Sequence, residues 1–290
     1  MINGGTSLVG LLGNPVRHSL SPVMHNAALE SMGLNWRYLA LPCKSESLDQ
    51  VLQGLRAVGC QGLNVTIPHK QAIADLCEEL SPLAQRLGAV NTLVPGTNGG
   101  WYGTNTDVEG FLAPLLGANE TWAGRHAVVI GCGGSARAVV AGLQNLNLKT
   151  ITVVGRRSEA LQAFITDLQQ SSAPLTACLD NAPQLNDAIA QAALVVNTTP
   201  VGMAQHGDPE AMPLGAELWT ELNAEAVLYD LIYTPRPTSW LAARQRRGHH
   251  CIDGLEMLVQ QGAASLRLWS GRNDVPVEAM RSAAATALAT

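Results

Sequence analysis

The chain has 290 residues, of which 47% are hydrophobic and 14% charged, and its formal net charge at pH 7 is -5. This length is sufficient for two domains with sizeable cores, and a negative charge without a basic stretch excludes a nucleic-acid-binding protein. Six cysteines without a C-x-x-C pair indicate reduced thiols, and no apolar run is long enough to span a membrane. We therefore expect a cytoplasmic protein that binds neither membrane nor metal.

The first part of the chain alternates predicted strands and helices. Ser21 and Pro22 suit a helix N-terminus, and Ser47 and Gln50 have the spacing of a capping box. Strands that alternate with helices predict a parallel or mixed α/β sheet. The predicted strands span residues 7–12, 36–41, 62–66, 89–94 and 101–103, and the predicted helices span residues 21–33, 47–59, 68–79 and 106–116.

A glycine-rich turn follows the strand predicted over residues 127–130. Gly131, Gly133 and Gly134 come next, and the alanine-rich residues 136–146 predict a helix. Glycines let the backbone approach a pyrophosphate, and a helix N-terminus supplies free N–H groups and a positive dipole end. The segment therefore predicts a dinucleotide cradle, with an ordinary tight turn as the alternative. The residues expected in this cradle are Gly131, Gly133, Gly134, Ser135 and Ala136.

Two arginines follow the next predicted strand, residues 150–154. An NAD-binding domain tends to carry an Asp or Glu near this point for the ribose hydroxyls, whereas Arg156 and Arg157 stand here. A guanidinium pairs with a phosphate in a bidentate, charge-assisted way. The arginines therefore favour NADP as the cofactor, and a solvated loop at a strand end is the alternative.

The remaining pattern divides the chain into two domains. Further helices are predicted over residues 158–170 and 182–191, and further strands over residues 193–196 and 226–229. Two alanine-rich helices, 254–269 and 276–288, come last, and no predicted strand follows them. Because they cannot extend the nucleotide sheet, we expect them to pack on the first domain. The predicted domains are residues 1–106 with 254–290, and residues 107–253.

Polar side chains gather at predicted strand-to-helix junctions, where α/β folds place ligands. The hydroxyls of Ser19 and Ser21 precede a helix and suit a carboxylate, with a capping role for Ser21 as the alternative. Asn64 and Thr66 share one side of a strand end. Lys70 falls in the first turn of the next predicted helix, where the dipole disfavours a cation. Catalysis would explain that lysine, and a side chain in water is the alternative.

Other polar residues have structural interpretations that suffice. Thr106 and Glu109 match a capping box, and Asp107 suits the first turn of a helix. Asn91 suits a cap or a turn. Gln261 and the glutamine before it interrupt an apolar helix, so at least one of them lies near the buried side and needs hydrogen-bond partners.

Five segments together resemble the shikimate dehydrogenase family: residues 19–21, 64–70, 89–92, 105–107 and 253–261. The resemblance extends over nearly the whole chain. It implies reversible, NADPH-dependent reduction of 3-dehydroshikimate to shikimate in aromatic amino-acid biosynthesis. It also implies an N-terminal α/β substrate domain completed by the C-terminal helices, and a Rossmann-like NADP-binding domain. We expect a monomer or homodimer whose partner is its small-molecule substrate.

The resemblance also implies roles for individual residues. Lys70 and Asp107 match the family's catalytic pair, in which the lysine gives a proton to the developing alkoxide and the aspartate orients it. Ser19 and Ser21 match serines that hold the substrate carboxylate, and Tyr233 matches a tyrosine near the substrate. The expected substrate-binding residues are Ser19, Ser21, Asn64, Thr66, Asn91, Thr106, Tyr233 and Gln261. The expected cofactor-binding residues outside the cradle are Arg156, Arg157, Thr198 and Gly254.

The segment around Arg156 departs from the family pattern. Many NADP-specific members read Asn-Arg-Thr where this chain has Gly155, Arg156 and Arg157, so Arg156 keeps its match and Arg157 is a substitute. Related quinate/shikimate dehydrogenases that use NAD read Asn-Arg-Arg followed by an acid, whereas Ser158 comes before Glu159 here. The alternatives are a quinate/shikimate dehydrogenase that uses NAD or both cofactors, and a non-catalytic dinucleotide-sensing regulator. The presence of both catalytic matches speaks against the regulator.

Overall fold

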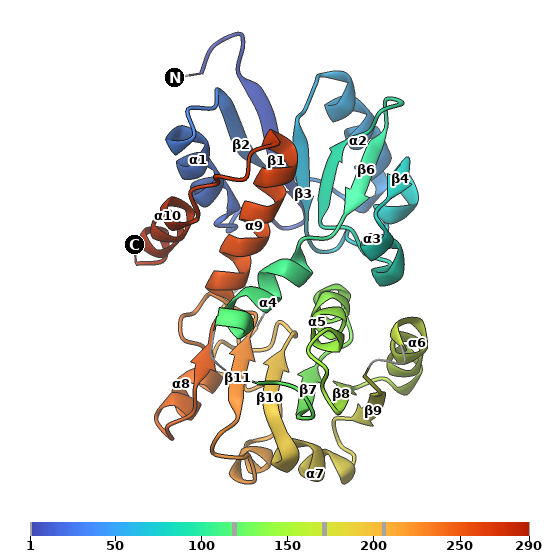
Figure 1. Ribbon diagram of the computed structural model, residues 1–290, viewed down its shortest axis with the longest axis vertical. Helices are drawn as coiled ribbons and strands as arrows, with labels where there is room; N and C mark the ends of the chain where they lie inside the picture. Colours follow the sequence, from blue (N-terminus) through green and yellow to red (C-terminus); the bar gives the residue numbers. More distant parts are fainter. Residues whose placement is uncertain (1, 118–120, 170–172, 205–206, 290) are drawn as a thin grey trace. The chain divides into compact units, whose positions relative to one another are not determined.

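The chain forms two α/β units in a computed structural model that describes residues 2–117, 121–169, 173–204 and 207–289 (Figure 1). One compact unit comprises Met1–Gly110 with Leu258–Thr290, and the other comprises Phe111–Met257. Within the described residues each unit contains one six-stranded sheet. The boundaries fall inside α4 (Asp107–Gly117) and α9 (Gly254–Ser270). The predicted fold class is confirmed: a split α/β unit accompanies a Rossmann-like one.

The sheet of the first unit is mixed, in the order β2-β1-β3-β5-β6-β4. Strand β1 is parallel to both β2 and β3, whereas β5 runs antiparallel to β3 and β6. Its buried side chains, among them Leu12, Leu63 and Leu93, form the core of the unit. The strands are β1 (Ser7–Gly13), β2 (Trp36–Pro42), β3 (Gly62–Val65), β4 (Glu79–Leu80), β5 (Thr92–Pro95) and β6 (Trp101–Thr104).

The last two helices pack on this first unit, as predicted. Helix α10 contacts α1, and the two lie side by side in Figure 1. Trp269 of α9 donates its indole N–H to the carbonyl of Leu93 in β5 at 3.0 Å. A Cβ at Gly62 would lie 2.2 Å from the Trp269 ring, so only glycine allows this approach of α9 to β3. The helices of the unit are α1 (Ser21–Ser31), α2 (Leu48–Ala57), α3 (Pro82–Leu87), α9 and α10 (Val277–Leu288).

The sheet of the second unit is parallel, in the order β12-β11-β10-β7-β8-β9. The strand order reverses at β7, which pairs with β8 on one side and β10 on the other. Open α/β sheets bind ligands outside the carboxyl ends of their strands at such a point. The strands are β7 (His126–Ile130), β8 (Thr150–Gly155), β9 (Leu175–Leu179), β10 (Ala192–Asn197), β11 (Val227–Asp230) and β12 (Cys251–Ile252). The helices are α5 (Gly134–Gln144), α6 (Ser158–Leu168), α7 (Gln184–Gln191) and α8 (Ser239–Gln245).

The helix predicted over residues 68–79 is wrong. The segment forms turns and a short 3-10 helix, Ala74–Leu76. The carbonyl oxygen of Lys70 accepts a hydrogen bond from the N–H of Val90 at 2.7 Å, not from a residue one turn further on. Because a contact outside the segment takes this carbonyl, Lys70 lies on a loop, and the helix-dipole argument does not apply to it.

Helix α3 was not predicted, although the sequence carries its signals. Ser81 is the N-cap, and its Oγ accepts from the N–H of Ala84 at 3.1 Å. Pro82 follows, and Gly88 ends the helix with a φ of 57°. Strands β4 and β12 are too short to show a period. The capping box predicted at Ser47 is wrong, because its side chain makes no cap hydrogen bond in α2.

Within the described ranges, no helix combines the length and the apolar character needed to cross a membrane. The same part of the chain holds no group of three or more His, Cys, Asp or Glu side chains arranged to bind a metal ion.

Candidate active site

Four loops meet at one edge of the first unit's sheet. Strands β1 and β3 are parallel, so the loops that follow them leave at the same edge. The register pairs Asn64 near the end of β3 with Thr92 at the start of β5, and Thr92 with Thr104 at the end of β6. The loop before β5 and the loop after β6 therefore reach this edge too. The polar residues on these loops include Ser19, Lys70 and Asn91, and Asp107 begins the helix that follows the last loop.

Lys70 and Asp107 form an ion pair in which Nζ lies 2.6 Å from Oδ2. The Lys70 side chain is 14% exposed and that of Asp107 only 6%. Asp107 is the first residue of α4, and its N–H donates to Oδ1 of Asn105 at 3.0 Å. Removing either member of such a pair leaves an uncompensated charge with little access to water. The pair therefore holds a proton donor and a carboxylate at one point.

Asn91 connects this ion pair to the rest of the edge. Its Nδ2 donates to Oδ1 of Asp107 at 2.8 Å and to Oγ1 of Thr106 at 3.0 Å, and its Oδ1 accepts from the N–H of Thr106 at 2.8 Å. The capping box predicted for Thr106 and Glu109 is wrong. The Thr106 hydroxyl bonds to Asn91, and Glu109 forms an ion pair with Arg267. Both amide and hydroxyl are buried and fixed by their partners.

Gln261 adds a second amide from α9. Its Oε1 accepts from Nδ2 of Asn91 at 3.3 Å, and its Nε2 donates to the carbonyl of Leu258 at 2.8 Å. The side chain is buried. The prediction that one of the two adjacent glutamines lies on the buried side and has partners is confirmed.

Asn64 joins the same cluster through residues that the sequence analysis did not single out. The Tyr38 hydroxyl donates to Oδ1 of Asn64 at 2.9 Å, and Nδ2 of Asn64 donates to Oγ of Ser265 at 2.8 Å. Ser265 in turn lies 2.8 Å from the hydroxyl of Thr92. Ser265 follows Gln261 by four residues, a helical spacing visible in the sequence. Tyr38 lies in an ordinary strand pattern, which carries no such signal.

Ser21 does not cap α1, so that alternative is wrong. Leu20 holds the N-cap position and no side chain caps the helix. The N–H of Ser21 donates to Oγ of Ser19 at 3.2 Å, and its carbonyl accepts from Nδ1 of His25 at 2.9 Å. Burial lowers the pKa of His25 to about 4, and the ring stacks on Tyr38 with centroids 4.1 Å apart. The Ser21 hydroxyl is therefore not spent on capping.

Thr66 is not joined to the cluster by a hydrogen bond. Its N–H donates to the carbonyl of Leu12 at 2.9 Å, and in the part of the chain that the structure describes its hydroxyl has no partner. A Cβ at Gly13 would lie 2.4 Å from the Thr66 methyl group, so this glycine makes room for the threonine.

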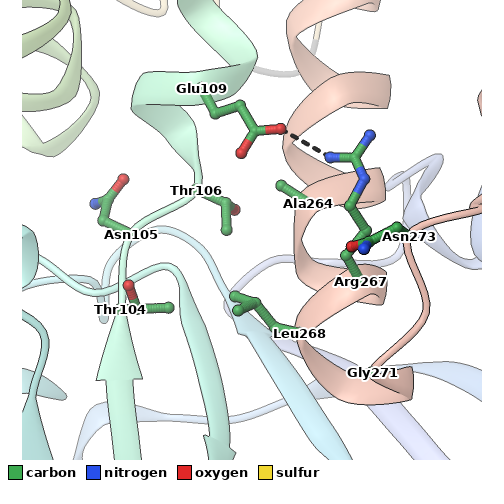
Figure 2. Close-up of a pocket in the computed structure, with 9 residues that line it drawn as sticks. All are labelled: Thr104, Asn105, Thr106, Glu109, Ala264, Arg267, Leu268, Gly271 and Asn273. Carbon is green, nitrogen blue, oxygen red and sulfur yellow. Dashed lines mark hydrogen bonds and ion pairs between the residues drawn. The ribbon is translucent and has the colours of Figure 1, made fainter.

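A pocket of about 520 Å³ shares Thr106 with the cluster (Figure 2). Glu109 of α4 and Arg267 of α9 point toward each other across it, and their ion pair measures 2.8 Å. The lining residues are Thr104, Asn105, Thr106, Glu109, Ala264, Arg267, Leu268, Gly271 and Asn273. Thr106 alone among the predicted substrate-binding and catalytic residues lines it. The site assignment therefore rests on the buried cluster and not on this pocket.

The second unit carries the glycine turn directly after β7. Gly131 has a φ of 107°, which favours glycine, and a Cβ there would lie 2.5 Å from Oγ1 of Thr198. The Thr198 hydroxyl donates to the carbonyl of Ile130 at 2.7 Å. Helix α5 starts at Gly134, two residues earlier than predicted, with Gly133 at its N-cap and no side-chain cap. Its first turn consists of Gly134, Ser135 and Ala136. The first turn of α5 follows the glycine turn, and its N–H groups have no side-chain cap, so they fit a pyrophosphate.

Arg156 and Arg157 are exposed at the carboxyl end of β8. Arg157 is the N-cap residue of α6 and makes no side-chain cap hydrogen bond. Among the described residues neither guanidinium has a hydrogen-bond or ion-pair partner. Two cations without partners at this strand end suit the 2′-phosphate of NADP better than the ribose diol of NAD.

Asp230, at the end of β11, holds the loop that carries Tyr233. Its carboxylate accepts from Nδ2 of Asn197 at 3.0 Å, from the N–H of Ile232 at 3.1 Å and from the hydroxyl of Thr238 at 2.8 Å. Burial raises the pKa of Asp230 to about 6 despite these donors. Burial also raises the pKa of the Tyr233 phenol.

Gly254 has a packing role that suffices by itself. A Cβ at this position would lie 2.0 Å from the carbonyl oxygen of Leu231. Its N–H donates to the carbonyl of Ile232 at 3.1 Å, which fixes the first residue of α9 against the same loop.

Comparisons with known proteins show the family to which the chain belongs. The model of the shikimate dehydrogenase substrate binding domain matches residues 11–93, and that of the shikimate 5'-dehydrogenase C-terminal domain matches residues 254–285. A shikimate dehydrogenase (NADP(+)) from Synechocystis sp. is 50% identical over 282 residues, which cover 97% of this chain and 96% of the relative. The chain belongs to the shikimate dehydrogenase family.

Solved shikimate dehydrogenases have the same fold along their whole length. The enzyme from Thermus thermophilus, in complex with NADP(H) and shikimate, is 36% identical with a TM-score of 0.84, covering 97% of this chain and 100% of that one. A shikimate dehydrogenase in complex with NADP+ is 33% identical with a TM-score of 0.88, covering 99% and 98%. The resemblance inferred from five short segments is confirmed.

Proposed function

We propose that Lys70 and Asp107 carry the acid–base chemistry of shikimate dehydrogenase in this chain. The chain is an NADP-dependent oxidoreductase that reversibly reduces 3-dehydroshikimate to shikimate in the shikimate pathway of aromatic amino-acid biosynthesis. The observation that supports the roles is the 2.6 Å ion pair within a buried cluster of amides and hydroxyls. When bound, NADPH supplies the hydride that reduces the ring ketone.

Lys70 gives the proton that the reduced oxygen needs. A ketone oxygen that becomes an alkoxide requires a proton donor within hydrogen-bond reach. The ammonium has three N–H bonds, and Asp107 takes one of them at 2.6 Å, so two remain for the substrate. In the reverse direction the amine of Lys70 takes the proton from the hydroxyl that is being oxidised. Asp107 orients the ammonium because Asn91 fixes the other carboxylate oxygen.

The cluster residues bind the substrate around this pair. We assign the substrate carboxylate to Ser19 and Ser21, because the Ser21 hydroxyl is not used as a cap. Gln261 donates one Nε2 proton to a backbone carbonyl, so its second proton is left for a substrate hydroxyl. The other residues that we assign to the substrate are Asn64, Thr66, Asn91, Thr106 and Tyr233.

NADP binds to the second unit through the glycine turn and the two arginines. We assign the pyrophosphate to the first turn of α5 and the 2′-phosphate to Arg156 and Arg157, which have no partners among the described residues. The residues assigned to the cofactor are Gly131, Gly133, Gly134, Ser135, Ala136, Arg156, Arg157, Thr198 and Gly254.

We also propose the domain boundaries, the oligomeric state and the compartment of the enzyme. The substrate domain comprises residues 1–106 with 254–290, and the NADP domain comprises residues 107–253. We place the enzyme in the cytoplasm, as a monomer or homodimer. The six free cysteines support a reducing compartment.

Initial rates with shikimate or quinate, each with NADP or NAD, test the substrate and cofactor directly. The expected result is the highest kcat/KM for shikimate with NADP. A higher value for quinate with NAD would identify a quinate dehydrogenase. Binding of NADP without turnover of either substrate would point to the regulator.

A further inference from the structure

Two buried hydroxyls contact the side chains of Asn64 and Asn91, which we assign to the substrate. Thr92 and Ser265 are fully buried, and their oxygens are 2.8 Å apart. Thr92 opens β5 directly after Asn91, and Ser265 lies on α9 one turn after Gln261. Neither can touch a ligand without displacing what covers it, so any role must act through their neighbours.

The proton of Thr92 is committed to Asn91. Backbone N–H groups only donate, so the 2.8 Å contact from the N–H of Thr106 marks Oδ1 of Asn91 as an acceptor. The Thr92 hydroxyl lies 2.9 Å from the same oxygen and must donate to it. With its single proton used, the Thr92 oxygen is an acceptor for Ser265.

Ser265 connects Thr92 to the amide of Asn64. Nδ2 of Asn64 lies 3.3 Å from the carbonyl of Asn91, which only accepts, so this end of the Asn64 amide is the donor. It donates to Oγ of Ser265 at 2.8 Å. The proton of Ser265 has two acceptors within reach, the carbonyl of Gln261 at 3.0 Å and the Thr92 oxygen at 2.8 Å. One hydroxyl therefore connects Asn64, Thr92 and the backbone of α9.

These contacts form one continuous chain of hydrogen bonds that ends on the catalytic carboxylate. The Tyr38 hydroxyl donates to Asn64 at 2.9 Å, and Asn91 donates to Oδ1 of Asp107 at 2.8 Å. In order, the hydrogen-bonded residues are Tyr38, Asn64, Ser265, Thr92, Asn91 and Asp107. Successive hydrogen bonds in a buried chain polarise one another and make each orientation depend on the next.

We propose that Thr92 and Ser265 are positioning residues, which fix the amide orientation of Asn64 and Asn91 and through Asn91 hold the carboxylate of Asp107 toward Lys70. This inference rests on the proposed roles of the Lys70–Asp107 pair. A serine in a helix commonly bonds the carbonyl four residues earlier, as Ser270 does to Leu266 at 2.7 Å. Ser265 differs because it also contacts Asn64, Thr92 and Thr106.

Thr92→Val and Ser265→Ala test the proposal, with Ser270→Ala as the matched control on the same helix. Valine keeps the shape of threonine and removes the hydroxyl. We expect kcat/KM for shikimate to fall about 10- to 100-fold in each variant, while KM for NADP stays within about twofold. Thr92→Ser, which restores the hydroxyl, should recover activity to within about threefold, and Ser270→Ala should change nothing. The double variant should lose less than the product of the two single losses, because both break one chain.

The same assay separates this inference from the function on which it rests. Lys70→Ala is measured beside these variants. If Lys70→Ala loses most of its turnover while Thr92→Val and Ser265→Ala keep shikimate kinetics within about twofold of the parent, the positioning role alone is overturned. Normal turnover of Lys70→Ala would overturn the acid–base role. An equal loss in Ser270→Ala, or no recovery in Thr92→Ser, would show a general packing effect and would also overturn the proposal. If Thr92→Val unfolds, Ser265→Ala carries the test, since alanine favours a helix.

Discussion

Asn91 donates an amide hydrogen to Oδ1 of Asp107 at 2.8 Å. Lys70 holds the other carboxylate oxygen, Oδ2, at 2.6 Å. Both oxygens therefore face donors, and only a side chain with two acceptor atoms satisfies both neighbours. This is a more demanding role than a favourable charge in the first turn of α4.

Asp107→Asn should lower kcat by about 10²-fold or more, because an amide has one acceptor oxygen and turns an N–H toward either Lys70 or Asn91. Steady-state rates with shikimate and NADP both saturating measure the loss. A role in helix stability alone predicts a lower midpoint of thermal unfolding with unchanged kcat. That pattern would remove Asp107 from the mechanism.

Ser21→Ala should weaken shikimate binding about 10- to 150-fold, the equivalent of one hydrogen bond to a charged group. Ser19→Ala should do the same, and neither should change the Kd of NADP. Ser81→Ala is the matched control, since Ser81 is a real N-cap: it should cost about 1 kcal/mol of stability and leave shikimate binding unchanged. Calorimetric titration and thermal unfolding measure both quantities. Normal shikimate affinity in both Ser19→Ala and Ser21→Ala would refute the carboxylate assignment.

Arg156→Ala should raise KM for NADP about 10- to 150-fold and change KM for NAD far less, because only NADP carries the 2′-phosphate. Arg125→Ala is the control for net charge, since Arg125 is exposed just before β7, at the opposite end of the strands. Equal changes for NADP and NAD would show that Arg156 does not contact the phosphate.

His25 should make the first unit sensitive to acid. Its pKa is lowered from 6.5 to about 4 in the folded chain. The unfolded chain therefore binds a proton that the folded chain does not, so this term lowers stability as pH falls from 6.5 to 4. Between pH 7 and pH 5 the loss is about 2 kcal/mol. His25→Gln keeps an N–H donor for Ser21 without titrating, so its unfolding free energy should change less between these pH values. Identical changes in the two proteins, measured by urea unfolding, would contradict this.

Much of the fold could be predicted because its signals are local. The glycine turn before α5 lies within a few residues of the strand and helix that define it, and the alternation of strands and helices fixes an α/β class. The meeting of Lys70, Asn91 and Asp107 could be expected because each stands beside the end or the start of a strand, where the sheet brings its loops together. Helix α3 could also have been predicted from local signals. Ser81, Pro82 and Gly88 form the same pattern of serine, proline and terminal glycine that predicted α1.

The rest depends on contacts between residues far apart in the sequence. Val90 takes the carbonyl of Lys70 and turns an expected helix into a loop. Ser265 meets Asn64 across 201 residues, and Tyr38 reaches the same amide from another strand. The periodicity of hydrophobic residues and the spacing of motifs along the sequence carry no information about such pairs. The capping interpretation of Thr106 is wrong for the same reason: its hydroxyl bonds to the side chain of Asn91, which lies 15 residues earlier in the sequence.

The central claim is that Lys70 donates the proton, and one measurement tests it most directly: kcat of folded Lys70→Ala with shikimate and NADP saturating. The account predicts a fall of about 10²- to 10⁴-fold, with KM for shikimate changed much less, because the contact strengthens in the transition state. Lys44→Ala, at an exposed lysine of the same unit, should keep parental kinetics. A kcat for Lys70→Ala within a few-fold of the parent would contradict the account and leave the reaction without its acid.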